Sequence, residues 1–158
     1  MSGLAVVRRV LGVDFGRARI GVAVSDELGM LAHPLETIPG VKIEAAAKRV
    51  AEIAREKNVQ RVVLGLPRHM NGEMGAAAAE VKVFAEKLRP LLACGLLLWD
   101  ERLTTTAANR ALRDGGQKTR RTRGFVDQVA AQMILQGYLD RAQSLGAPLE
   151  SPELSPPE

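Results

Sequence analysis

Aromatic residues are scarce in this chain of 158 residues, of which Phe, Trp and Tyr together make up 3%. Proteins that bind single-stranded nucleic acid commonly stack bases on aromatic side chains, so this composition argues against such a platform. A single cysteine, Cys94, excludes an internal disulfide and a cysteine-rich zinc site. No apolar run is long enough to cross a bilayer, and residues 1–7 lack the features of a secretory signal. We therefore expect a cytoplasmic protein without a membrane partner.

Negative charge is concentrated near the end of the sequence. The formal net charge is +4, yet residues 147–158 contain three glutamates and no lysine or arginine. The preceding part of the chain is therefore more basic than the whole, which favours a polyanionic partner. The composition from residue 146 onward, rich in Pro, Ser and Glu, is typical of disorder. We expect one folded domain over residues 1–145 and a disordered tail over residues 146–158.

The apolar pattern predicts an α/β fold. Two β-branched runs flank a turn at Gly16 and a third strand follows over residues 30–38, which favours an antiparallel meander. Pro34 places this third strand at an edge or at a bulge. Two more strands, over residues 61–65 and 95–99, alternate with helices over residues 42–57, 73–89, 104–112 and 125–144. The order indicates a five-stranded mixed sheet, three strands antiparallel and the later ones parallel, flanked by helices.

Three acidic residues fall where the pattern predicts burial. Asp14 ends the first strand, Glu101 follows the fifth, and Asp127 lies in the first turns of the last helix. The ends of strands in one sheet and a helix packed over it can bring such side chains together. Clustered carboxylates repel one another in a low dielectric unless cations bridge them, and ligation by oxygen alone suits Mg²⁺ or Mn²⁺. The pattern favours a metal site that these three residues share.

Each of these acidic residues also has a simpler interpretation. Asp14 could accept hydrogen bonds from N–H groups of the following turn. Asp127 could be an acid favoured by the dipole at a helix N-terminus. Glu101 could pair with Arg102, with Arg110 or with an arginine of the opening turn.

Basic residues flank the same positions. They are Arg17, Arg19, Arg68, Lys118, Arg120, Arg121 and Arg123. The first two follow Asp14, Arg68 follows the fourth strand, and the others lie in a basic loop predicted over residues 117–124. An acidic centre with a basic rim is what metal-dependent hydrolysis of a nucleic-acid backbone requires. The alternative for residues 118–123 is a solvated loop without a ligand.

Four ordered segments of the chain resemble the YqgF family, also called RuvX. They are Leu11–Gly16 with Arg19–Ala23, Val63–Pro67 with Asn71–Gly72, Asp100–Thr105, and Val126–Ala131. The family is described as Holliday-junction resolvases of the RNase H-like superfamily, and its members are also linked to trimming the 5′ end of pre-16S ribosomal RNA. The resemblance implies an RNase H-like fold and a metal site built by Asp14, Glu101 and Asp127.

The resemblance also implies a nuclease mechanism with two Mg²⁺ or Mn²⁺ ions, fully bound only with substrate, that leaves 5′-phosphate and 3′-hydroxyl ends. Asp14 would bridge both ions, and Glu101 and Asp127 would complete one each. RuvC-type resolvases carry a fourth acid one turn further along the last helix, where this chain has Ala130. The expected partner is branched DNA or precursor rRNA, and symmetric cleavage of a junction calls for a homodimer.

Two other functions fit parts of the pattern. Asp14-Phe15-Gly16 followed by Gly21 resembles the first phosphate loop of actin-like ATPases, although the chain is too short to hold their second lobe. A non-catalytic nucleic-acid-binding or regulatory module could keep the same fold and metal site. An Asp14→Asn variant separates the nuclease from this module, because only an enzyme has cleavage to lose.

Overall fold

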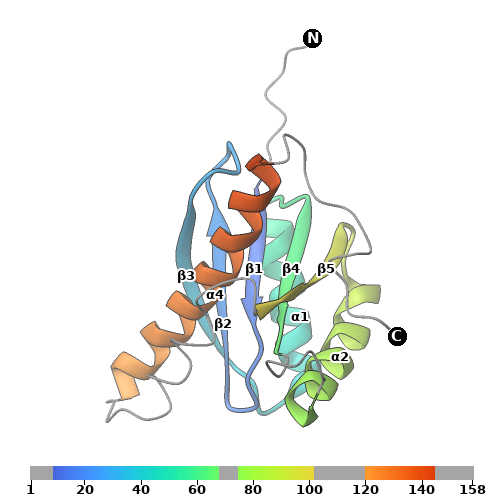
Figure 1. The fold of residues 1–158 in the computed structure, drawn as a ribbon. Helices are drawn as coiled ribbons and strands as arrows, with labels where there is room; N and C mark the ends of the chain where they lie inside the picture. The colour runs from blue at the N-terminus through green and yellow to red at the C-terminus, as the bar shows by residue number, and fades with distance from the viewer. Residues whose placement is uncertain (1–8, 68–74, 102–119, 145–158) are drawn as a thin grey trace.

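A computed structural model describes residues 9–67, 75–101 and 120–144, with side chains in the last range from residue 125 onward. Five strands form one sheet in the order β3-β2-β1-β4-β5 (Figure 1). The strands are β1 Val10–Asp14, β2 Arg19–Ser25, β3 Ala32–Pro39, β4 Arg61–Leu66 and β5 Gly95–Asp100. The helices are α1 Ile43–Glu56, α2 Ala76–Leu88, the 3₁₀ turn η1 Arg89–Leu91 and α4 Arg120–Ser144. None of the helices described is long and apolar enough to span a bilayer.

The strand pairing confirms the predicted mixed sheet. β1 pairs antiparallel with β2, and β2 pairs antiparallel with β3, whereas β1, β4 and β5 run parallel. The β2–β3 ladder shifts register between Val22 and Ala23, where Ala23 lies opposite Pro34. Pro34 therefore lies on an edge strand beside a bulge, as a residue without an N–H donor should.

Helices cover both faces of the sheet. α4 crosses one face, and α1 and α2 pack on the other (Figure 1). Because side chains alternate along a strand, Leu11 and Val13 join the core beneath α1 and α2, whereas Val10 joins the core beneath α4. Asp14 has the same parity as Val10, so the carboxylate that ends β1 belongs to the face covered by α4.

The last helix begins earlier than the sequence pattern predicts. α4 starts at Arg120, so Arg120, Arg121 and Arg123 are helical and the prediction of a loop through residue 124 is wrong for them. Gly124 lies inside the helix, where a glycine costs only about 1 kcal/mol relative to alanine, and arginine is a good helix former. Asp127 therefore lies beyond the first turn, too deep for the dipole at the helix terminus to explain it.

The turn between β2 and β3 also takes more residues than expected. The Asp26 carboxylate accepts a 2.8 Å hydrogen bond from the Met30 N–H, which lowers the pKa of Asp26. Gly29 adopts a positive φ of 70°, and β3 begins only at Ala32. The predicted helix from Thr104 and the predicted tail over residues 146–158 lie outside the described residues.

A row of glutamines fixes α4 along the edge strand β3. Gln132 donates a 2.9 Å hydrogen bond to the Ala32 carbonyl oxygen, and the Gln136 side-chain oxygen accepts one of 2.9 Å from the Ala32 N–H. Gln128 donates to the Thr37 hydroxyl at 3.0 Å. Residues spaced by four share one face of a helix, so these side chains together hold α4 against β3.

Candidate active site

The backbone of Asp127 packs on Gly21, the β2 residue that lies opposite Asp14. Asp14 lies opposite Gly21 in the β1–β2 ladder. A Cβ atom on Gly21 would come within 1.9 Å of the Asp127 carbonyl oxygen, so the α4 backbone rests directly on this glycine. The contact brings Asp127 over the end of β1. Both carboxylates are buried, with Asp14 4% and Asp127 5% exposed.

Glu101 reaches the same face from the end of β5. A Cβ atom on Gly65 of β4 would lie 3.4 Å from the Glu101 Cγ and 2.5 Å from the Ile134 Cδ1 of α4. The pairing of Val13 with Leu64 places Gly65 beside Asp14. Glu101 is 3% exposed, and two alternative partners for it, Arg102 and Arg110, lie outside the described residues. The structure thus places the three predicted acids on one face and at one end of the sheet.

These three carboxylates have the donor chemistry of a magnesium or manganese site but not a closed geometry. Buried carboxylate oxygens are the ligands that hard divalent cations prefer. Within the parts of the chain that the structure describes, however, no three His, Cys, Asp or Glu side chains are grouped so as to hold a metal ion. The residue types nevertheless fit such an ion.

Arg19 forms an ion pair inside this candidate site. Its Nε donates to the Asp127 Oδ2 at 2.5 Å. Arg19 opens β2 two residues before Gly21, so both residues share the α4 face. A buried carboxylate is costly to desolvate, and the guanidinium offsets that cost. The Arg19 side chain is 37% exposed, whereas the Asp127 side chain is 7% exposed.

Arg17 points to a different element. It donates to the carboxylate of Glu80 on α2, and this hydrogen bond raises the pKa of Arg17. The turn that carries Arg17 and leads to Arg19 is fixed by Gly40, whose N–H donates to the Ala18 carbonyl oxygen at 2.9 Å. The predicted pair of arginines is therefore split between the two faces of the sheet.

Sequence comparison identifies the family. A family model described as "RuvX: Holliday junction resolvase" matches residues 8–141. The chain belongs to the RuvX family. A protein of Nocardia farcinica named "Putative pre-16S rRNA nuclease" is 46% identical over 144 residues, which cover 87% of this chain and 80% of the relative. A protein of Chloroflexus aggregans with the same name is 46% identical over 131 residues, covering 83% and 92%.

Solved structures confirm the fold of this RuvX chain. Thermus thermophilus RuvC in complex with a Holliday junction substrate matches with a TM-score of 0.54 at 17% identity, covering 89% of this chain and 98% of that one. A second structure of RuvC from the same organism matches with a TM-score of 0.50. At this identity the likeness shows the fold alone, which is the predicted RNase H-like fold.

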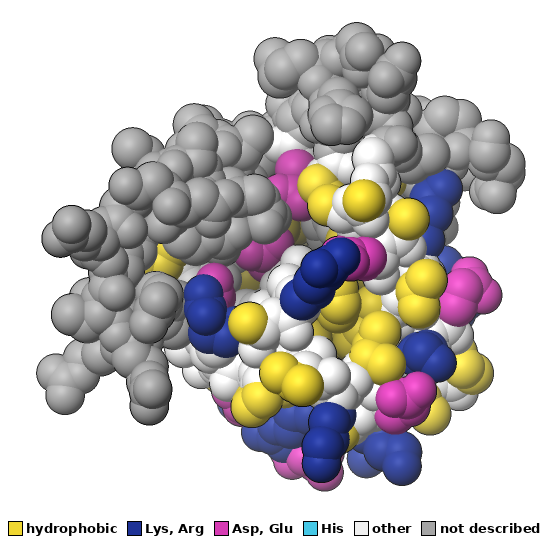
Figure 2. Space-filling model, turned by 90° about the horizontal axis from the view of Figure 1, so that it is seen from below, with side chains coloured by type: hydrophobic (Ala, Val, Ile, Leu, Met, Phe, Trp, Pro, Cys, Tyr) yellow, Lys and Arg dark blue, Asp and Glu magenta, His cyan; other side chains and the backbone are white. Residues whose placement is uncertain are grey.

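The structure does not describe the side chains of the other basic residues predicted for the site. Arg68 and Lys118 are outside the described residues, and Arg120, Arg121 and Arg123 are placed only by their backbone in the first turns of α4. The N-terminal part of α4 extends past the sheet (Figure 1). Viewed toward the end where β1 finishes, the surface carries lysine and arginine side chains among acidic ones (Figure 2).

Several residues that shape the site were not predicted from the sequence. Gly21 lies in a quoted motif, but nothing in the motif indicates that α4 touches it. Glu80 pairs with Arg17 only because α2 docks beside the β1–β2 turn. The glutamines of α4 did carry a signal, because Gln128, Gln132 and Gln136 recur every four residues.

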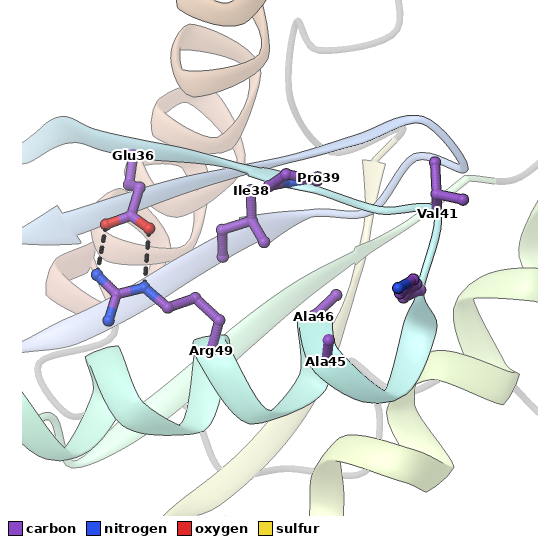
Figure 3. Close-up of a pocket in the computed structure, with 8 residues that line it drawn as sticks. Glu36, Ile38, Pro39, Val41, Ala45, Ala46 and Arg49 are labelled. Atoms are coloured by element: carbon purple, nitrogen blue, oxygen red, sulfur yellow. Dashed lines mark hydrogen bonds and ion pairs between the residues drawn. The ribbon is translucent and has the colours of Figure 1, made fainter.

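A groove of about 480 Å³ lies between β3 and α1, on the face of the sheet opposite Asp14 and Asp127 (Figure 3). Its lining is Glu36, Ile38, Pro39, Val41, Lys42, Ala45, Ala46 and Arg49. At one end Arg49 donates two hydrogen bonds to the Glu36 carboxylate, from Nε at 2.9 Å and from a terminal nitrogen at 2.8 Å. This bidentate pair joins the edge strand to the helix.

The Glu36–Arg49 pair should make folding stability depend on pH. Hydrogen bonding from Arg49 lowers the pKa of Glu36 below its ordinary value of 4.5. The pair therefore contributes stability above pH 4.5 that is lost as pH falls through the lowered pKa. We expect Glu36→Gln to lower Tm at pH 7 and the two melting temperatures to converge as the pH falls below 4.5 and through the lowered pKa of Glu36 in thermal melts. A gap between them that stays constant over this range would contradict the prediction.

Proposed function

We propose that this RuvX chain is a metal-dependent endonuclease that hydrolyses phosphodiester bonds of structured nucleic acid. The observation that carries the proposal is the placement of three buried carboxylates, Asp14, Glu101 and Asp127, on one face and at one end of the sheet. Membership of the RuvX family and the nuclease names of relatives at 46% identity support it.

Each residue of the site has a separate role in this proposal. Asp14, Glu101 and Asp127 hold Mg²⁺ or Mn²⁺ through their carboxylate oxygens. A bound divalent ion supplies activation of water and stabilisation of the departing 3′ oxygen. Arg19 opens β2 on the face of Asp14 and positions a backbone phosphate, and Arg17 positions another from the opposite face, where it pairs with Glu80. Arg120, Arg121 and Arg123 in the first turns of α4 supply further positive charge for backbone phosphates.

Two substrates are candidates, each favoured by a different observation. The family description names the Holliday junction, and the RuvC structure of the same fold contains a junction substrate. The relatives are named for pre-16S rRNA. A four-way junction has two equivalent strands to cut, so resolving it calls for a homodimer with two sites, whereas trimming one RNA end does not.

Cleavage assays on both substrates test the proposal directly. The full chain is incubated with a four-way DNA junction or a 16S rRNA precursor, in Mg²⁺, in Mn²⁺ or in EDTA, while light scattering reports the oligomeric state. We expect at least one substrate to be cut, only with metal, and a dimer if the junction is cut. Binding of both substrates without cleavage of either would instead identify a non-catalytic module.

A further inference from the structure

We propose that Arg19 is a positioning residue that couples metal binding at Asp127 to nucleic-acid binding. In the free protein Arg19 holds the Asp127 carboxylate. When a backbone phosphate arrives, Arg19 transfers to it and leaves Asp127 to the metal ion. The inference rests on the proposed nuclease function, and it adds that Arg19 is the residue that makes metal loading depend on the substrate.

The ion pair supplies the first part of this argument. One oxygen of Asp127 accepts from the Arg19 Nε at 2.5 Å. A carboxylate oxygen bound to a guanidinium is less available to a cation, and the positive charge of Arg19 repels a cation that approaches it. The described acids also do not form a closed metal cluster in this arrangement. Arg19 and a metal ion therefore compete for Asp127.

The difference in exposure between the two partners shows which of them can move. The Asp127 side chain is 7% exposed, and its backbone is pressed against Gly21. The Arg19 side chain is 37% exposed, so its guanidinium can turn toward solvent or toward a ligand. Asp127 is thus the fixed partner, and Arg19 is the one able to leave.

The backbone around Arg19 is held in place, so only the Arg19 side chain can move from Asp127 to a phosphate. Arg19 is held in the β2–β3 ladder opposite Pro39. A Cβ atom on Gly40 would lie 2.6 Å from the Gly16 carbonyl oxygen and 2.9 Å from that of Arg17, so the preceding turn is tightly covered. Rotation of the Arg19 side chain is therefore the available movement.

A phosphate is a suitable acceptor for the released guanidinium. Arginine binds phosphate oxygens through the same planar fork that it offers to a carboxylate. Once Arg19 has moved, its positive charge no longer offsets that of Asp127, and the metal ion can take its place at the carboxylate. Each ligand then favours the binding of the other, and linkage requires this coupling to be reciprocal.

Manganese titrations of the full chain, with and without a four-way DNA junction, test this coupling. Binding is followed by the EPR signal of free Mn²⁺ at 4 °C, with the junction checked for integrity on a denaturing gel. For the wild type we expect the junction to raise Mn²⁺ affinity by about 10-fold, within the usual range of coupling. For Arg19→Gln we expect tighter Mn²⁺ binding than wild type without the junction, and little further gain with it.

Arg49→Gln is the matched control, because it breaks the ion pair with Glu36 on the face of the sheet opposite Asp127. It should behave as wild type in both titrations. Arg19→Lys keeps the charge without the fork, and its titration tests the competition again if Arg19→Gln does not fold. Mn²⁺ binding that is unchanged or weaker in a folded Arg19→Gln overturns the role of Arg19 but leaves the nuclease proposal intact. Wild type that binds no Mn²⁺ either with the junction or with a 16S rRNA precursor overturns both.

Discussion

Asp14→Asn is expected to reduce cleavage on the order of 10³-fold or more while the protein stays folded and binds nucleic acid. Asn has nearly the same shape as Asp, so the packing under α4 is kept. It lacks the negative charge, however, and a neutral amide is a poor ligand for a hard divalent cation. Asp14 is 4% exposed and lies beside both Gly21 and Gly65, central to the three acids, so no neighbouring surface acid can replace it.

The control for this experiment is Asp26→Asn at the opposite end of the same sheet. Asp26 accepts a hydrogen bond from the Met30 N–H, which an Asn oxygen can also accept. We expect wild-type cleavage from this variant. The measurements are cleavage rate at saturating Mn²⁺, nucleic-acid affinity by gel shift, and circular dichroism. Cleavage by Asp14→Asn within a few-fold of wild type would remove Asp14 from the active site.

The sheet and the face of each acid could be predicted from local patterns. Apolar runs in β1 and β4 define strands by composition, and alternation along β1 assigns Asp14 to the face opposite Leu11 and Val13. The start of α4 could not be predicted in this way. Gly124 is a local signal for a break, and contacts made further along the helix, such as those of Gln132 and Gln136 with β3, outweigh it.

The candidate site shows a similar limit. The pattern predicts that Asp14, Glu101 and Asp127 share one end of the fold, and the structure places them there. The ion pair between Arg19 and Asp127 joins residues 108 positions apart, and it exists because α4 docks on Gly21. No spacing rule within one element encodes such a contact. The sequence therefore predicted that the three acids share one end of the sheet, but it did not predict that Arg19 pairs with Asp127.

The docking of α4 on Gly21 is the contact most sensitive to substitution. Gly21→Ala would place a methyl group 1.9 Å from the Asp127 carbonyl oxygen, a backbone atom of a long helix that cannot give way locally. We expect a loss of about 3 kcal/mol or more in the free energy of unfolding, at the upper end of overpacking effects. Because α4 must shift, Asp127 is displaced from Asp14, and the molecules that remain folded should also lose most of their cleavage.

Alanine substitutions at two other glycines give reference values for this loss of stability in urea unfolding measurements. A methyl group on Gly95 meets nothing within 4 Å, so Gly95→Ala should be neutral or stabilising by up to about 1 kcal/mol. A methyl group on Gly65 meets the Ile134 Cδ1 at 2.5 Å, the far end of a flexible side chain, so its cost should fall between the two. If Gly21→Ala unfolds like Gly95→Ala, the helix does not rest on β2 at this point. If it is destabilised but cleaves normally once folded, the position of Asp127 over β1 does not control the chemistry.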